Sequence, residues 1–124
     1  HLADADFDGQ SVVLAFVGYL TYQPSGSDLI HQEPSGSVIV LLNGADGAPT
    51  VFASTLPQTL PALNAVCYGK NIAWLAYPGI VWTAPDPEAD PIVVRSGTNE
   101  EIGRVGSKLL VVTRDSGVLL YDAP

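Results

Sequence analysis

The apolar residues of this chain fall into short runs separated by segments that contain glycine and proline. Its 124 residues include 12 glycines and 10 prolines. Valine, isoleucine, threonine and aromatic residues, which favour extended backbone, dominate the runs between them. The pattern predicts strands at residues 11–22, 37–42, 50–54, 72–77, 80–83, 91–96, 108–114 and 117–122.

Turn sequences stand between several of these runs. Residues 43–47 read Asn-Gly-Ala-Asp-Gly, and residues 115–117 read Asp-Ser-Gly and close a predicted hairpin between the last two strands. The sequence Pro-Ser-Gly-Ser occurs at residues 24–27 and again at residues 34–37. We expect these two copies to form similar turns that each lead into a short strand.

Short strands with a turn about every ten residues predict an all-β fold, an antiparallel sandwich or barrel-like domain. The length fits one domain over residues 1–124. At most one short helix is expected, around residues 58–70, because Pro61 suits a first helical turn and Gly69 a helix end. Since the chain begins with His1 and contains no methionine, we expect a processed chain or a fragment of a longer one.

Several predicted strands scarcely alternate between apolar and polar residues. Residues 37–42 read SVIVLL, residues 108–112 KLLVV and residues 118–121 VLLY, whereas a strand with one solvated face alternates. We expect both faces to be covered, by other protein subunits in an oligomer or larger assembly or, alternatively, by the core of a compact barrel. A charged fraction of 15%, against about 25% in ordinary soluble domains, favours the subunits, because large apolar surfaces mark interfaces.

The charge balance excludes some partners. Thirteen acidic residues against five basic ones give a net charge of −8, which repels nucleic acid and anionic membranes. The longest uncharged apolar run, residues 11–22, is shorter than the about 20 residues that a membrane span needs. We therefore predict no nucleic-acid binding and no membrane insertion.

Residues 4–10, DADFDGQ, resemble the first half of the calcium-binding loop of EF-hands, in which alternate carboxylates converge on one ion. The glutamate that closes such a loop is replaced by Ala15. The alternative is an acidic, solvated leader to the first strand, so the sequence predicts either no cofactor or Ca²⁺. The candidate metal ligands are Asp4, Asp6, Asp8 and Gln10.

A second acidic stretch, APDPEADP at residues 84–91, spaces Asp86, Glu88 and Asp90 two apart. Its prolines enforce extended backbone, so the carboxylates share a face that can bind a cation or a basic partner. The alternative is a rigid surface loop. If this stretch met residues 4–8 in space, the two together would complete a calcium site.

Aromatic residues cluster between residues 68 and 82. Such a cluster is typical of a core or an interface, and alternatively of a platform for sugar rings. The candidate ligand-binding residues are Tyr68, Trp74, Tyr77 and Trp82.

No catalytic motif is present. Nucleophile elbows, zinc-binding His-Glu-x-x-His and phosphate loops are all missing, although a carboxylate pair for glycoside hydrolysis has no sequence signature. His1 is terminal, His31 is expected at the surface and Glu100–Glu101 in an exposed turn. The single cysteine, Cys67, lies in apolar sequence, which indicates a buried and unreactive thiol. We therefore do not expect an enzyme.

These patterns together predict a structural or adhesive subunit of an extracellular or virion assembly, which associates through apolar strand faces. The alternative function is a carbohydrate-binding module, assisted by calcium, that uses the aromatic cluster around Trp74 and Trp82.

Overall fold

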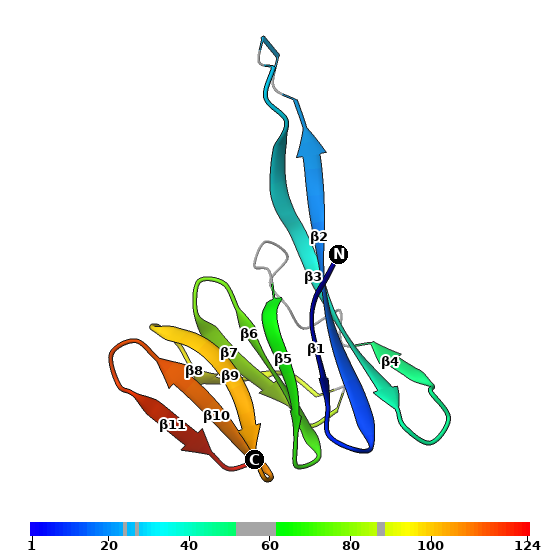
Figure 1. Ribbon diagram of the computed structural model, residues 1–124, viewed down its shortest axis with the longest axis vertical. Coiled ribbons are helices and arrows are strands. Elements are labelled where there is room, and N and C mark those ends of the chain that lie inside the picture. The colour runs from blue at the N-terminus through cyan, green and yellow to red at the C-terminus, as the bar shows by residue number, and fades with distance from the viewer. Residues whose placement is uncertain (24, 27, 52–61, 87–88) are drawn as a thin grey trace.

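The computed structural model describes residues 1–23, 25–26, 28–51, 62–86 and 89–124, with residues 19–22, 31–36 and 51 described by their backbone alone. This part of the chain forms three antiparallel sheets and no helix, so it holds no helix that could cross a membrane. The sheets are open and none closes into a barrel (Figure 1). The all-β prediction is confirmed, and the fold is sandwich-like.

Each sheet is a meander in which consecutive strands are neighbours. Sheet A consists of β1 (Leu2–Phe7), β2 (Ser11–Tyr22), β3 (His31–Asn43) and β4 (Pro49–Val51). Sheet B consists of β5 (Ala62–Tyr68), β6 (Asn71–Ala76), β7 (Ile80–Ala84) and β8 (Ile92–Arg95). Sheet C consists of β9 (Asn99–Val105), β10 (Lys108–Thr113) and β11 (Val118–Tyr121).

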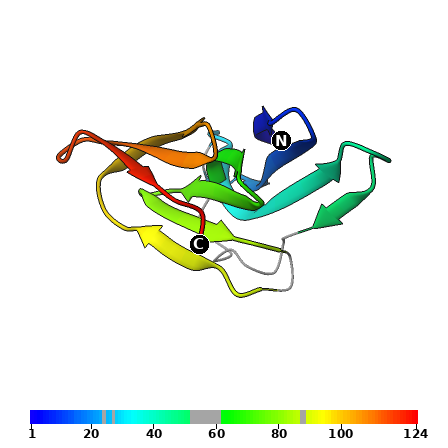
Figure 2. The same cartoon turned by 90° about the horizontal axis from the view of Figure 1, so that it is seen from below.

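Sheet B is the middle layer, because its two faces contribute to two different hydrophobic cores (Figure 2). Its face toward sheet A packs Ala65, Cys67, Ile72 and Trp74 against Val13, Ala15 and Ile39. Its opposite face packs Val66, Tyr68, Ala73, Leu75 and Val81 against Ile102, Leu109 and Val111 of sheet C.

The double coverage of sheet B explains the long apolar runs of its strands. All six residues of β6 are buried, which requires apolar side chains on both faces. Both faces are covered here by the same chain rather than by a neighbouring subunit. In the outer sheets the arrangement differs: on β10, Leu109 and Val111 are buried, whereas Leu110 and Val112 are half-buried on the face that points away from the body.

The helix considered for residues 58–70 is wrong over its described part. Residues 62–68 form β5 and residues 69–70 the turn into β6, while residues 58–61 lie outside the described residues. Because successive residues of β5 face the two cores in turn, an apolar run in this place is buried as a strand and needs no helix.

Two expected turns are strands in the structure. Glu100 and Glu101 belong to β9, where Glu101 lies opposite Val112 of β10. Residues 34–37 lie within β3, at a shift of its register with β2 between Gly18 and Tyr19. In both cases pairing with a neighbouring strand overrides the local turn or polar character of the sequence.

Strands β2 and β3 extend well beyond the rest of sheet A. They contain 12 and 13 residues against six in β1. Past Gly18 and Gly36 they continue as a two-stranded ribbon that projects from the body of the molecule (Figure 1). We call this ribbon, residues 19–22 and 31–36, the arm.

The core between sheets A and B predicts a strong effect of removing its largest side chain. Trp74 is 0% exposed, so Trp74→Ala is expected to lower the free energy of unfolding in urea by about 3–5 kcal/mol, through lost burial and the cavity left behind. The matched control is Tyr77→Ala, in the turn after the same strand and 59% exposed. Similar losses for the two variants would contradict this packing.

Candidate functional site

The acidic N-terminal stretch is mostly a strand rather than a loop. Asp4 and Asp6 lie on β1, opposite Ala15 and Val13 of β2. Those two β2 residues are fully buried on the inner face of sheet A, so the two carboxylates point toward sheet B as well. The alternation that resembled a calcium loop therefore places acidic side chains on one face of a strand.

The two carboxylates bind the edge of β5. The N–H groups of Ala65 and Cys67 both donate to them at 2.9 Å, to Asp4 Oδ2 and Asp6 Oδ2 respectively. The N–H of Ala62 donates to Ser37 Oγ of β3, also at 2.9 Å. Side chains of sheet A thus accept outward N–H groups that an edge strand would otherwise leave without partners.

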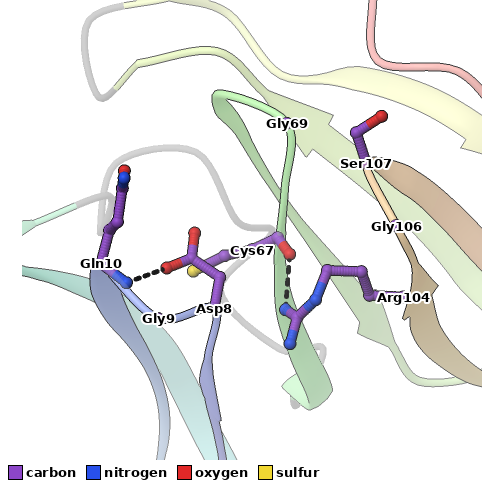
Figure 3. Close-up of a pocket in the computed structure, with 8 residues that line it drawn as sticks. All are labelled: Asp8, Gly9, Gln10, Cys67, Gly69, Arg104, Gly106 and Ser107. Atoms are coloured by element: carbon purple, nitrogen blue, oxygen red, sulfur yellow. Dashed lines mark hydrogen bonds between the residues drawn. The ribbon is translucent and has the colours of Figure 1, made fainter.

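Arg104 of β9 joins the third sheet to this edge. Its Nη1 donates to the carbonyl oxygen of Cys67 at 2.7 Å (Figure 3). The same Nη1 forms an ion pair with Asp6. Its Nη2 donates to the carbonyl oxygen of Phe7 at 3.1 Å. The guanidinium, carried by sheet C, therefore contacts the other two sheets through charge-assisted hydrogen bonds. We call this group, Asp4, Asp6, Ala65, Cys67 and Arg104, the three-sheet junction.

Asp8 has a separate role in the turn after β1. Its Oδ1 accepts the N–H of Gln10 at 2.8 Å (Figure 3) and that of Ser11, also at 2.8 Å. Gly9, between Asp8 and Gln10, adopts a φ of 98°. Partial burial raises the pKa of the Asp8 carboxyl, but these two N–H donors and the charge of Arg104 outweigh burial and lower the pKa below its usual value.

An open, polar depression lies beside the junction, where the turns of several hairpins meet. Its volume is about 500 Å³, and it is lined by residues of the turns at 8–10, 69 and 106–107 together with Cys67 and Arg104 (Figure 3). A neighbouring opening of about 470 Å³ lies between residues 9–11 and 43–45. There a Cβ at Gly44 would overlap the carbonyl oxygen of Gln10, which explains the glycine of the predicted turn at 43–47.

The predicted calcium ligands are not arranged around a common point. Among the described residues, no group of three or more His, Cys, Asp or Glu side chains is placed to hold a metal ion. Asp4, Asp6 and Asp8 instead accept backbone N–H groups, and Gln10 donates its own N–H to Asp8. Residues 4–6 are not a solvated leader either, because Asp4 and Asp6 are half-buried. Calcium binding stays a prediction.

The second acidic stretch does not join the first within the described chain. Asp86 accepts the N–H of Ala89 at 2.9 Å in a local turn, and Glu88 lies outside the described residues. His31 is described by its backbone alone, as part of β3. Neither stretch therefore contributes to a combined metal site in this part of the structure.

The aromatic cluster is largely core, so the four rings do not form one sugar platform. Trp74 and Tyr68 are 0% and 1% exposed, and they face the two different cores. Trp82 lies opposite Trp74 and is half-buried against the same core. Only Tyr77 is well exposed, so a carbohydrate site could use at most its ring and the open part of Trp82.

The buried hydroxyl of Tyr68 is paired internally, whereas the indole N–H groups of Trp74 and Trp82 are buried without a hydrogen-bond partner in the part of the chain that the structure describes. The hydroxyl of Tyr68 lies 2.6 Å from Thr83 Oγ1, which itself donates to the carbonyl oxygen of Ile72 at 2.8 Å. The hydroxyl of Tyr68 is therefore the donor to Thr83. Burial raises the pKa of Tyr68, which keeps this donor protonated.

Sequence reasoning missed the basic and amide partners of the site. Arg104 was one of several single bases, and nothing near it in sequence marks its contacts with residues 6 and 67. Asn99 was also missed: it is buried and donates to the carbonyl oxygens of Gly79 at 2.6 Å and Arg95 at 2.9 Å, which fastens β9 to sheet B. Asp4 and Asp6 are two residues apart, as are their partners Ala65 and Cys67. This match identifies the contact only once it is known that β1 lies beside β5.

No protein-family model matches the chain, and neither the curated proteins nor the solved structures contain a match. Function is therefore inferred from the residues of this chain alone.

The junction predicts a stability loss when Arg104 is removed. Arg104→Ala removes the guanidinium donor from the Cys67 carbonyl and leaves the Asp6 carboxylate with only the N–H of Cys67 as a donor from the described residues. We expect the free energy of unfolding to fall by about 2–3 kcal/mol. Arg104→Lys keeps the charge but loses the planar fork, so it is expected to recover only part of this.

The control for Arg104 is Arg114→Ala. The side chain of Arg114 is 73% exposed and pairs with Glu100 at 3.5 Å, so its loss should change stability by less than about 0.5 kcal/mol. Urea unfolding of the three variants measures the difference. Equal effects of Arg104→Ala and Arg114→Ala would show that the junction contributes nothing.

Burial of Cys67 predicts an unreactive thiol. Burial first, and then the negative charges of Asp8 and Asp6, raise the pKa of the Cys67 thiol to about 12, so almost no nucleophilic thiolate forms at neutral or mildly basic pH. Iodoacetamide at pH 8 is expected to label the native protein only as fast as it unfolds, and to label it fully in urea. Rapid, complete labelling of the native protein would contradict the buried position.

Proposed function

We propose that this protein is a non-enzymatic structural or adhesive subunit of an extracellular or virion assembly, which associates with other protein subunits through apolar strand faces. The observation that carries the proposal is the position of the exposed apolar side chains on the outward faces of the outer sheets. Phe7 of sheet A is 62% exposed, and Val118 and Leu120 of sheet C are 62% and 52% exposed.

These side chains belong to continuous surfaces. Phe7 lies opposite Val12 on the outer face of sheet A, and Leu120 lies opposite Leu110 on the outer face of sheet C. Exposed apolar side chains that stand singly are normal, but contiguous ones on a small domain mark an interaction surface. A charged fraction of only 15% supports the same conclusion.

The side chains that line the depression beside the three-sheet junction support a non-enzymatic role. The two charged side chains that line this depression hold the fold: Asp8 accepts two turn N–H groups, and Arg104 contacts Asp6 and Cys67. The thiol of Cys67 is held protonated, so it is not an activated nucleophile. The depression therefore lacks the pairing of nucleophile and base that covalent catalysis uses.

The native mass of the purified chain tests this proposal. Light scattering coupled to size exclusion, from micromolar to millimolar protein, is expected to give a mass that is a multiple of 13.0 kDa and that rises with concentration, because burying apolar faces drives association. A single 13.0-kDa species that stays soluble and monomeric at millimolar concentration would contradict association through these faces.

A further inference from the structure

We infer that two copies of this chain pack against each other through the outer face of sheet A, related by a two-fold axis, with the arm of each copy lying on the sheet of the other. The inference rests on the proposed function and names the surface and the partner. It is carried by the composition of this face, by the absence of charged side chains from its three rungs and by the arm that extends the same strands beyond the body.

The outer face of sheet A is apolar across three successive rungs of the sheet. Cross-strand pairing places its residues side by side on the face opposite to Val13, Ala15 and Ile39. The first rung consists of Phe7, Val12, Leu42 and Pro49, the second of Ala5, Leu14 and Val40, and the third of Leu2, Phe16 and Val38.

Charge distinguishes this face from its counterpart on sheet C. None of the ten residues in these rungs carries a charge, whereas the outer face of sheet C includes Lys108 and Glu101 beside Leu110 and Val112. Two copies with a net charge of −8 each repel one another, and removing charged groups from water adds a further cost. Within the body, the three uncharged rungs of sheet A are where two copies can approach without burying charged side chains of those rungs.

The face suits an identical partner. Sheets pack on one another through interdigitated apolar side chains about 10 Å apart, and a two-fold axis supplies the same apolar surface on both sides. A basic or polar partner would leave this face without complementary groups. A second copy gives it an apolar surface of the same dimensions.

The arm extends two strands of the same face beyond the body. Within the body, β2 runs over residues 11–17, and the arm continues it over residues 19–22, with residues 31–36 of β3 beside it. When two sheets face each other with β2 strands antiparallel, the arm of each copy lies over the body of the other. A two-stranded ribbon is only marginally stable alone, and this contact covers it.

The area agrees with that of a stable dimer. With strands about 4.8 Å apart and about 3.4 Å per residue, the body and arm of sheet A present a flat footprint of about 550 Å². Side-chain relief makes the accessible area larger than the flat footprint, which brings it toward the roughly 800 Å² per partner of standard interfaces.

The decisive experiment compares Leu14→Lys with Leu120→Lys. Leu14 is on the central rung of sheet A, and Leu120 is on the outer face of sheet C. Each substitution adds one positive charge and lowers the repulsion between copies equally. We expect Leu14→Lys to raise the dimer dissociation constant by about 30- to 1000-fold, as for loss of a central interface residue, and Leu120→Lys to change it less than about threefold.

A second variant covers the case in which Leu14→Lys does not fold, which thermal melting reports. Val40→Thr keeps the shape of a β-branched side chain and adds only a hydroxyl to the same rung, and it is expected to weaken the dimer by about three- to tenfold. Hydrogen exchange gives an independent readout, because the arm amides at residues 19–22 and 31–36 should be protected in the dimer and exchange rapidly in the monomeric variant.

The outcomes separate the inference from the proposed function. Dissociation by Leu120→Lys but not by Leu14→Lys or Val40→Thr would overturn the sheet A interface and leave an assembly subunit that uses sheet C. Arm amides that exchange equally fast in dimer and monomer would overturn the placement of the arm. A monomeric wild type overturns both proposals, and binding of that monomer to phosphatidylcholine vesicles would assign the face to lipid instead.

Discussion

The fold depends on an edge strand whose outward N–H groups find partners in side chains of another sheet. β5 is the first strand of sheet B, yet its edge lies against sheet A, where water cannot serve all of its backbone donors. Asp4 and Asp6, two residues apart on β1, meet Ala65 and Cys67, two residues apart on β5. Without these acceptors the edge would leave donors unsatisfied, so the contact that holds sheet B between its neighbours depends on them. Arg104 then neutralises Asp6 and brings sheet C to the same edge.

Much of this architecture was predictable from sequence, and the strands that were not predicted have physical reasons. Apolar runs and Gly-rich turns predicted most strands of the three meanders and the hairpin at residues 115–117, because these features depend on local periodicity. β1, β5 and β9 were missed because pairing and burial, rather than local preference, decide their conformation. β1 carries alternate carboxylates typical of a loop, β5 carries helix-compatible signals, and β9 begins with polar residues. The order of the three sheets could not be predicted either, because it depends on contacts between strands that are far apart in sequence.

The candidate site was also only partly predictable, because its contacts depend on the folded arrangement of the strands. The spacing of the alternate acidic residues was the informative feature, but a strand places side chains with that spacing on one face rather than in a ring around an ion. Arg104 carried no local signal, because its partners lie in distant parts of the sequence. The aromatic residues were identified as core or platform, and burial of Trp74 and Tyr68 decides for core. The partly buried polar side chains of the junction thus connect the sheets to one another, while the outer sheets present apolar side chains on their outward faces.

The ion pair between Asp6 and Arg104 closes a long loop of the chain. Asp6 and Arg104 stand 98 residues apart in sequence, so their contact joins two nearly terminal segments into one ring. A disulfide would hold such a ring in the unfolded chain as well and restrict its entropy, but a chain with a single cysteine cannot form one internally. The ring made by Arg104 exists only in the folded state and opens with every unfolding event. The chain is therefore closed on itself by a noncovalent contact, which a reductant cannot open.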